Sequence, residues 1–138
     1  MSDVLAALGA TVRALRATLD RELRSQGLRL GQYQVLRVLW ESDGLTPRDL
    51  AGRLAVEMPT VTRTVQRMFR DGLVRREDHP SDARSVNIFL TDRGREVRAP
   101  IERLLDDHMS RVLAGFTDRD RQSIVGYLER ILANARIL

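Results

Sequence analysis

The sequence predicts a mainly α-helical protein that carries one small β-hairpin. Apolar residues recur at steps of three and four along most of the 138 residues, which is the period of an amphipathic helix. Between Leu73 and Leu90 the period changes to two, as in a pair of strands. The capping residues Thr46, Thr91 and Thr117 divide the helical regions from one another.

Two helices are expected in the first third of the chain. The first spans residues 3–24 and ends near Gly27, a residue type that favours left-handed helix ends. Its apolar stripe consists of Leu5, Leu8, Val12, Leu15, Leu19 and Leu23. The second helix spans residues 31–41, and Asp43-Gly44 indicates a turn after it.

A short helix and a longer one are expected next. Thr46 fits the N-cap of the short helix, Pro47 suits its first position, and Asp49 completes a capping box. A tight turn then leads to a helix over residues 59–70, for which Gly72 is the expected C-cap. The apolar side of this second helix consists of Val61, Val65, Met68 and Phe69.

The hairpin and two more helices complete the chain. Strands are expected at residues 73–77 and 85–90, with residues 78–84 as the loop between them. In the second strand the residues that alternate toward the core are Val86, Ile88 and Leu90. Thr91 then caps a long helix over residues 92–116, in which Pro100 should cause a kink or an irregular start. A last helix follows Thr117 and extends to residue 138.

Composition narrows the class of protein. Hydrophobic residues make up 43% and charged residues 30% of the chain, which is typical of a folded, single-domain protein. No apolar run approaches the roughly 20 residues of a membrane span, and no basic segment precedes a hydrophobic stretch at the N-terminus. We therefore expect a cytoplasmic protein that has no membrane partner.

Patterns for catalysis or metal binding are sparse. The sequence has no cysteine, which excludes disulfides, thiolate metal sites and cysteine-based redox sensing. His79 and His108 are the two histidines, and no phosphate-binding loop, dinucleotide-binding glycine motif or zinc-protease motif occurs. We expect no enzyme activity, no cofactor and no metal. A carboxylate-rich metal site is the alternative that the residues leave open.

Positive charge is concentrated in one segment. All 23 basic residues are arginines, and the chain has a net charge of +4. Residues 59–76 contain five arginines against one acid, Asp71, so this segment alone accounts for a net charge of +4. A local basic excess on an otherwise balanced chain indicates a docking surface for a polyanion. A solvated helix face is the alternative interpretation.

The order of elements predicts a winged helix-turn-helix protein. A short helix, a tight turn and a second helix form the helix-turn-helix, and the hairpin after them forms the wing. The second helix, residues 59–70, would lie in the major groove of double-stranded DNA. Its polar side carries hydroxyl, amide and guanidinium groups that can bond phosphates and base edges. The candidate contacts are Thr60, Thr62, Arg63, Gln66 and Arg67, with Arg48 of the short helix as a phosphate contact.

The stretch from Leu30 to Gly94 resembles the MarR family of winged helix-turn-helix transcriptional regulators. The matching segments are QYQVL at 32–36, LTPRDLA at 45–51, PTVTR at 59–63, DGLV at 71–74 and DARSVNIFLT at 82–91. The resemblance implies a homodimer built from the N-terminal helix and two C-terminal helices, a palindromic operator, and in many members a small-molecule effector. It implies an effector pocket where the DNA-binding lobe meets the dimerisation helices. Residues near this junction are Leu15, Tyr33 and His108, for which ordinary packing is the alternative.

The wing segment, residues 78–85, contains an aspartate and an arginine two positions apart. Arg84 is placed to enter the minor groove, whose negative potential attracts a guanidinium, and Asp82 could hold its side chain. A surface ion pair of little consequence is the alternative. The chain departs from the family pattern at Ala83, where many members have a basic residue, and at Met58, which cannot cap the helix after it.

The predicted organisation is a single domain over residues 1–138. Residues 30–91 form the DNA-binding lobe, and residues 3–26 and 92–138 form dimerisation helices. These terminal segments contain more apolar residues than a small lobe needs for its own core, which favours a homodimer over helices folded back on the lobe. We expect a dimeric repressor. The alternative is a helical dimerisation or adaptor module whose winged helix binds protein.

Overall fold

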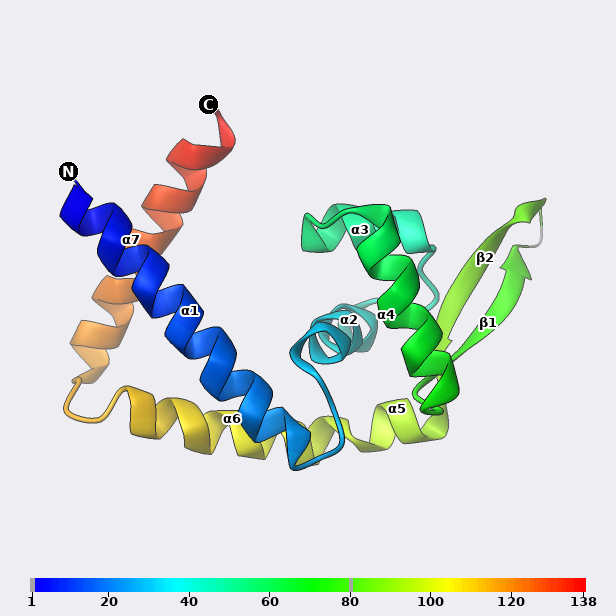
Figure 1. The fold of residues 1–138 in the computed structure, drawn as a ribbon, viewed down its shortest axis with the longest axis horizontal. Helices are drawn as coiled ribbons and strands as arrows, with labels where there is room; N and C mark the ends of the chain where they lie inside the picture. Colours follow the sequence, from blue (N-terminus) through cyan, green and yellow to red (C-terminus); the bar gives the residue numbers. More distant parts are fainter. Residues whose placement is uncertain (1, 80) are drawn as a thin grey trace. The chain divides into compact units, whose positions relative to one another are not determined.

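The structure is a computed structural model that describes residues 2–79 and 81–138. These residues form seven helices and a two-stranded antiparallel hairpin, whose arrangement can be followed in Figure 1. In chain order the elements are α1 (Ser2–Arg24), α2 (Leu30–Glu41), α3 (Pro47–Leu54), α4 (Met58–Arg70), β1 (Val74–His79), β2 (Asp82–Leu90), α5 (Asp92–Glu96), α6 (Arg98–Val112) and α7 (Asp118–Arg136). The prediction of a mainly α-helical chain with a winged helix-turn-helix is confirmed.

The chain divides into two compact units, Met1–Leu105 and Asp106–Leu138. The hydrophobic core belongs to the first unit, where α1, α2, α3, α4, the hairpin and the first half of α6 each contribute. Its fully buried residues include Leu23, Leu36, Leu39, Leu50, Met68, Ile88 and Ile101. In the second unit, α7 has no buried residue. No helix among the described residues is both long and apolar enough to cross a membrane.

Local hydrogen bonds begin the helices where the sequence predicts. Thr46 and Asp49 form a reciprocal capping box at α3, with both N···O distances at 3.1 Å. Thr117 and Asp120 do the same at α7, at 2.9 and 3.0 Å. Such boxes satisfy amide groups that have no partner inside the helix. The two residues of each box lie within one turn of each other, which explains why sequence alone can identify them.

The hairpin is longer than the sequence predicts. The strands pair from Val74 opposite Leu90 to His79 opposite Asp82, so most of the predicted loop over residues 78–84 is strand. Residues 78–84 are mostly polar, so their sequence shows no alternation of apolar and polar residues. Backbone pairing between strands requires no apolar side chain, and the strands therefore continue beyond the hydrophobic core.

The predicted helix over residues 92–116 is interrupted and ends early. Val97 separates α5 from α6, and Pro100 lies in the first turn of α6, where a missing amide hydrogen costs little. The expected irregularity at Pro100 is therefore confirmed. Helix α6 ends at Val112 because Gly115 has a φ of +87°, which a right-handed helix does not allow.

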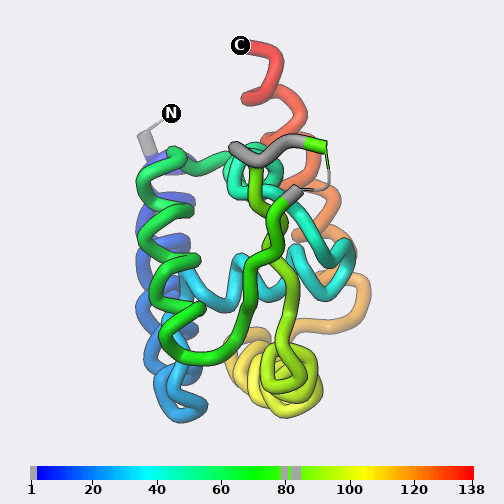
Figure 2. The backbone as a smooth tube through the Cα atoms, turned by 90° about the vertical axis from the view of Figure 1, so that its right-hand side faces the viewer, coloured from blue at the N-terminus to red at the C-terminus, as the bar shows by residue number. Residues whose placement is uncertain are grey.

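Figure 2 looks onto the hairpin and shows how it is supported. Helix α4 runs beside β1, and α5 lies beneath the base of the hairpin. At this base the Thr91 hydroxyl donates to the Gly72 carbonyl at 2.6 Å, and its amide donates to the Leu73 carbonyl at 3.1 Å. Trp40 of α2 donates from Nε1 to the Gly94 carbonyl at 2.9 Å. The end of α4, the hairpin and α5 are thus joined at one point.

Candidate nucleic-acid interface

A three-residue turn connects the two helices of the helix-turn-helix, α3 and α4. Ala55 adopts the left-handed conformation with φ +54° and ψ +45°, and the Val56 amide donates to the Ala51 carbonyl at 3.1 Å. Beyond the turn, Val61 and Val65 of α4 are buried together with Leu50 of α3. This packing directs the opposite, polar side of α4 toward solvent.

The predicted DNA contacts gather on that exposed side. The side chains of all six predicted residues on α3 and α4 are exposed: Arg48, Thr60, Thr62, Arg63, Gln66 and Arg67. In the part of the chain that the structure describes, the three arginines of this set form no ion pair. Their guanidinium groups are therefore available to phosphates or base edges.

The first turn of α4 has no side-chain cap. Glu57 occupies the N-cap position, but its side chain accepts no bond from the helix, and Pro59 follows Met58 in the first turn. The sequence predicts this lack of a polar cap. Uncapped amides and the helix dipole together attract anions, so the start of α4 is electrostatically suited to a phosphate.

The hairpin is attached to the segment before α3. The Ile88 amide donates to the Leu45 carbonyl at 2.7 Å, and Asn87 Nδ2 donates to the Gly44 carbonyl at 3.0 Å. Gly44 has a φ of +75°, and a Cβ atom there would lie 2.6 Å from the Phe89 ring. Glycine is thus required twice over at this position, by backbone conformation and by space. The attachment holds the wing at a defined place beside α4.

Arg75 and Arg76 of β1 face opposite sides of the hairpin. Arg75 pairs with Glu77, and its guanidinium lies 4.9 Å from the centre of the Phe89 ring. Arg76 lines a hollow of about 130 Å³ that Thr62 and Gln66 of α4 also line. Of these two arginines, Arg76 is therefore the one on the side of α4.

The roles of the two wing-tip residues remain predictions. The backbone of Asp82 and Arg84 belongs to β2, but the side chains of both residues lie outside the part of the structure that is described. The pairing of Asp82 with Arg84 and the entry of Arg84 into the minor groove therefore rest on the sequence.

Comparisons with known proteins agree with this geometry. The model of the MarR family matches residues 28–86. The homoprotocatechuate degradative operon repressor of Escherichia coli is 31% identical over 102 residues, which are 74% of this chain and 69% of the repressor. The chain belongs to the MarR family. The prediction from the sequence motifs is thereby confirmed, and this MarR-family protein is a transcriptional regulator rather than an enzyme.

Solved structures share the fold along nearly the whole chain. A MarR transcriptional regulator from Methanosarcina mazei Go1 aligns with a TM-score of 0.90 at 24% identity, covering 100% of both chains. Reduced AbfR bound to DNA aligns with a TM-score of 0.78 at 23% identity, covering 97% of this chain and 93% of AbfR. In that structure AbfR is bound to DNA.

The residues predicted for an effector pocket lie in different parts of this MarR-family regulator. Leu15 and Tyr33 belong to the first unit and are half-buried, and Tyr33 packs edge-on against Trp40 with ring centres 6.2 Å apart. His108 belongs to the second unit and is buried. That the three line one pocket stays a prediction.

Two polar contacts that the sequence did not reveal connect the helices near α4. Gln32 is 4% exposed; its Oε1 accepts from the Arg29 amide at 3.0 Å, and its Nε2 donates to Asp71 Oδ2 at 2.9 Å. Asp20 of α1 accepts from the Leu30 amide at 2.9 Å and so caps α2 from outside. The signal for Gln32 was its place three residues after the N-cap of α2. No local pattern could identify Asp20.

Asp20 should make stability depend on pH. The hydrogen bond from the Leu30 amide is the largest cause that lowers the pKa of the Asp20 carboxyl below its ordinary value of 3.8. Partial burial opposes this shift, and Arg29 and Arg24 add to it. A carboxyl group whose pKa is lower in the folded state than in the unfolded state stabilises the fold at pH values above its unfolded-state pKa. This stabilisation is lost as the pH falls through the folded-state pKa.

We therefore expect Asp20→Ala to lower the free energy of unfolding at pH 7 by about 0.5–2 kcal/mol, as for loss of a helix cap. The difference from the unmodified protein should shrink as the pH falls below about 4. Urea unfolding at a series of pH values measures it. Asp106→Ala is the matched control, because Asp106 is exposed and forms no ion pair among the described residues. A cost at Asp20 that is equally large at pH 7 and at pH 2 would contradict the assignment.

Proposed function

We propose that this MarR-family regulator is a dimeric repressor that binds a palindromic operator. In this proposal α4 lies in the major groove, the wing at residues 78–85 enters the minor groove, and Arg48 contacts a phosphate. The observation that carries the proposal is the solvent-facing side of α4, which exposes hydroxyl, amide and guanidinium groups. The first turn of the same helix has no side-chain cap. A helix that reads DNA from the major groove needs such groups to be exposed and available to phosphates and base edges.

Exposed apolar residues on the terminal helices support the homodimer. Helix α7 exposes an apolar stripe whose members are Val125, Leu128, Ile131 and Leu132, each 42–53% exposed. Val12 of α1 is 52% exposed, and Val4 and Leu5 are more exposed still. Soluble proteins rarely leave apolar stripes of this kind in contact with water. A two-fold interface would cover them and would match the symmetry of two operator half-sites.

The functional division that we propose is a DNA-binding lobe at residues 30–91 with dimerisation helices at 3–26 and 92–138. A repressor of this kind acts in the compartment that holds the DNA, which we take to be the cytoplasm. Control by a small-molecule effector is part of the proposal, with Leu15, Tyr33 and His108 as its pocket.

Recovery of bound fragments from sheared genomic DNA tests the function. We expect enrichment of fragments that share a palindrome, and affinity for that palindrome that falls steeply with salt because neutralised phosphates release counterions. Each phosphate contact contributes about −0.9 to the slope of log K against log salt. Retention of DNA without sequence preference would overturn the proposal in favour of an adaptor module.

Leu128→Asp tests the dimer. A carboxylate in the α7 stripe would be buried without a partner in the proposed interface, so we expect the variant to be monomeric or to aggregate. The unmodified protein should have twice the 15.7 kDa chain mass in light scattering coupled to size exclusion. Gln122→Asp is the control, because Gln122 lies on the same helix and is exposed. A stable wild-type monomer at micromolar concentration would contradict the dimer.

A further inference from the structure

The apolar stripe of α4 continues one turn beyond the hydrophobic core. Its members Met58, Val61, Val65 and Met68 follow one another at steps of three and four. Val61, Val65 and Met68 are at most 4% exposed, whereas Met58 is 41% exposed. Packing in the core therefore explains three of these apolar residues and leaves Met58 on the surface.

Met58 lies at the end of α4 that a helix-turn-helix presents to base edges. It is the first residue of α4, and the N-terminal residues of the second helix in this motif contact bases in the major groove. Because the Cα–Cβ bonds of a helix tilt toward its N-terminus, the long Met58 side chain extends toward the helix start. Figures 1 and 2 show that β1 runs in the opposite direction to α4. The start of α4 and the outer ends of the strands therefore lie at the same end of the first unit.

A methionine side chain can recognise few features of a base pair. It donates no hydrogen bond, and its sulfur is only a weak acceptor. The groups that distinguish the base pairs in the major groove are hydrogen-bond donors and acceptors, with the C5 methyl group of thymine as the one apolar exception. A flexible thioether adapts readily to an apolar neighbour of this size. The chemistry of Met58 therefore fits thymine better than any other base.

We propose that Met58 determines specificity by contacting the C5 methyl group of one thymine in each operator half-site. This inference rests on the proposed function, in which α4 lies in the major groove. Contact with the methyl group removes two apolar surfaces from water. A polar base edge in the same place would lose its water without gaining a hydrogen bond. Met58 thus favours thymine and also disfavours the other bases.

Operators in which single thymines are replaced by deoxyuridine test this contact. Deoxyuridine pairs as thymine does and lacks only the methyl group. At one thymine of each half-site, we expect its loss to weaken binding by about threefold to fourfold, the usual effect of one buried carbon group. Substitution in both half-sites should weaken binding by about tenfold, since the two contacts add. Equal binding of the thymine and deoxyuridine operators at every position would overturn the inference.

Variants of Met58 assign the effect to this side chain. Met58→Gln keeps the length of the side chain but makes its end polar, so we expect it to bind the thymine and deoxyuridine operators equally well. Met58→Leu keeps an apolar contact and should still prefer thymine. Val56→Ala is the control, because Val56 is 38% exposed and precedes α4; it should keep the full preference. Equal loss of the preference in the Val56 and Met58→Gln variants would overturn the assignment to Met58.

Each preference is a ratio of two affinities measured with one protein preparation, so a change in the folded fraction of a variant cancels. Failure of the unmodified protein to bind any palindrome would overturn the proposed function. Salt-dependent binding of a palindrome that has no methyl-sensitive thymine would leave that function standing and overturn only the Met58 contact. Weaker binding of Met58→Gln to all operators, with the thymine preference intact, would place Met58 against the DNA backbone and would also overturn the base contact.

Discussion

Gly94→Ala is expected to reduce the free energy of unfolding by about 3 kcal/mol, the upper end of the usual range for overpacking. A Cβ atom at this position would lie 2.2 Å from the Leu73 carbonyl oxygen and 3.2 Å from Leu90 Cδ2. The carbonyl cannot move without cost, because it accepts the Thr91 amide at 3.1 Å. Gly94 itself is held by Trp40 through its carbonyl. Relief of the clash must therefore separate α5 from the base of the hairpin.

Urea unfolding measures this loss, and Gly52→Ala is the control. Gly52 is also helical, but a Cβ atom there would have no neighbour within 4 Å. Alanine at that position should leave stability unchanged or raise it by up to about 1 kcal/mol. DNA affinity of the Gly94 variant should fall as well, because the base of the wing is displaced. An unfolding midpoint equal to that of the unmodified protein would contradict the close packing at Gly94.

Arg63→Ala is expected to weaken operator binding by about 1–3 kcal/mol and to relax base preference at one position of each half-site. Arg63 is exposed in the first turns of α4 and has no ion pair among the described residues. In the proposed docking its guanidinium is within reach of base edges in the major groove. Loss of a bidentate contact to one base should lower the affinity for operators with the preferred base more than the affinity for operators with another base at that position.

Arg84→Ala should have a different signature. The wing arginine is predicted to sense groove shape and phosphate charge, so its loss should weaken binding to all operator variants by a similar factor. It should also make the salt dependence shallower. Titration of both variants against an operator library at two salt concentrations distinguishes the two roles. Arg37→Ala, on the exposed side of α2, is the control. Unchanged affinity of the Arg84 variant would contradict the assignment of the wing.

Most of the helix-turn-helix could be predicted from short sequence patterns. The capping boxes at Thr46 and Thr117 are present, and Gly72 has the expected positive φ of +74°. The alternation in the second strand is confirmed where it meets the core, since Ile88 and Leu90 are buried. These features depend on hydrogen bonds within one turn or on a repeating period, and neighbouring residues alone encode both.

Two predicted element boundaries were wrong, because the apolar pattern of the sequence did not mark where the backbone hydrogen bonding begins or ends. The strands continue into the predicted loop over residues 78–84 because backbone pairing leaves no apolar pattern in the sequence. The helix predicted to reach residue 116 ends at Val112, since the apolar period continues past the point where Gly115 turns the backbone. In each case the side-chain pattern and the backbone hydrogen bonds follow different rules.

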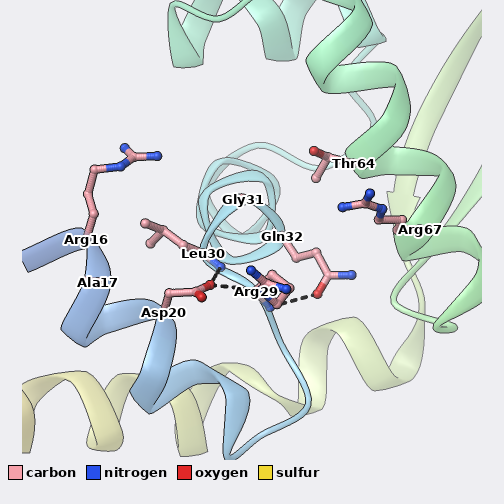
Figure 3. Close-up of a pocket in the computed structure, with 9 residues that line it drawn as sticks. All are labelled: Arg16, Ala17, Asp20, Arg29, Leu30, Gly31, Gln32, Thr64 and Arg67. Carbon is pink, nitrogen blue, oxygen red and sulfur yellow. Dashed lines mark hydrogen bonds and ion pairs between the residues drawn. The ribbon is translucent and has the colours of Figure 1, made fainter. Parts of the chain in front are cut away.

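The sequence by itself determined the helices, their buried faces, the basic recognition helix and the family. Only the tertiary structure decided which separated residues meet. Gln32 reaches Asp71, which is 39 positions away along the chain, and Asp20 caps a helix that begins 10 positions later. The same holds for the hollow of about 430 Å³ that α1, α2 and α4 line together, to which Arg16 and Arg67 contribute from different helices (Figure 3). A local pattern specifies a helix and the side it buries, but the neighbour across a contact depends on how whole helices pack.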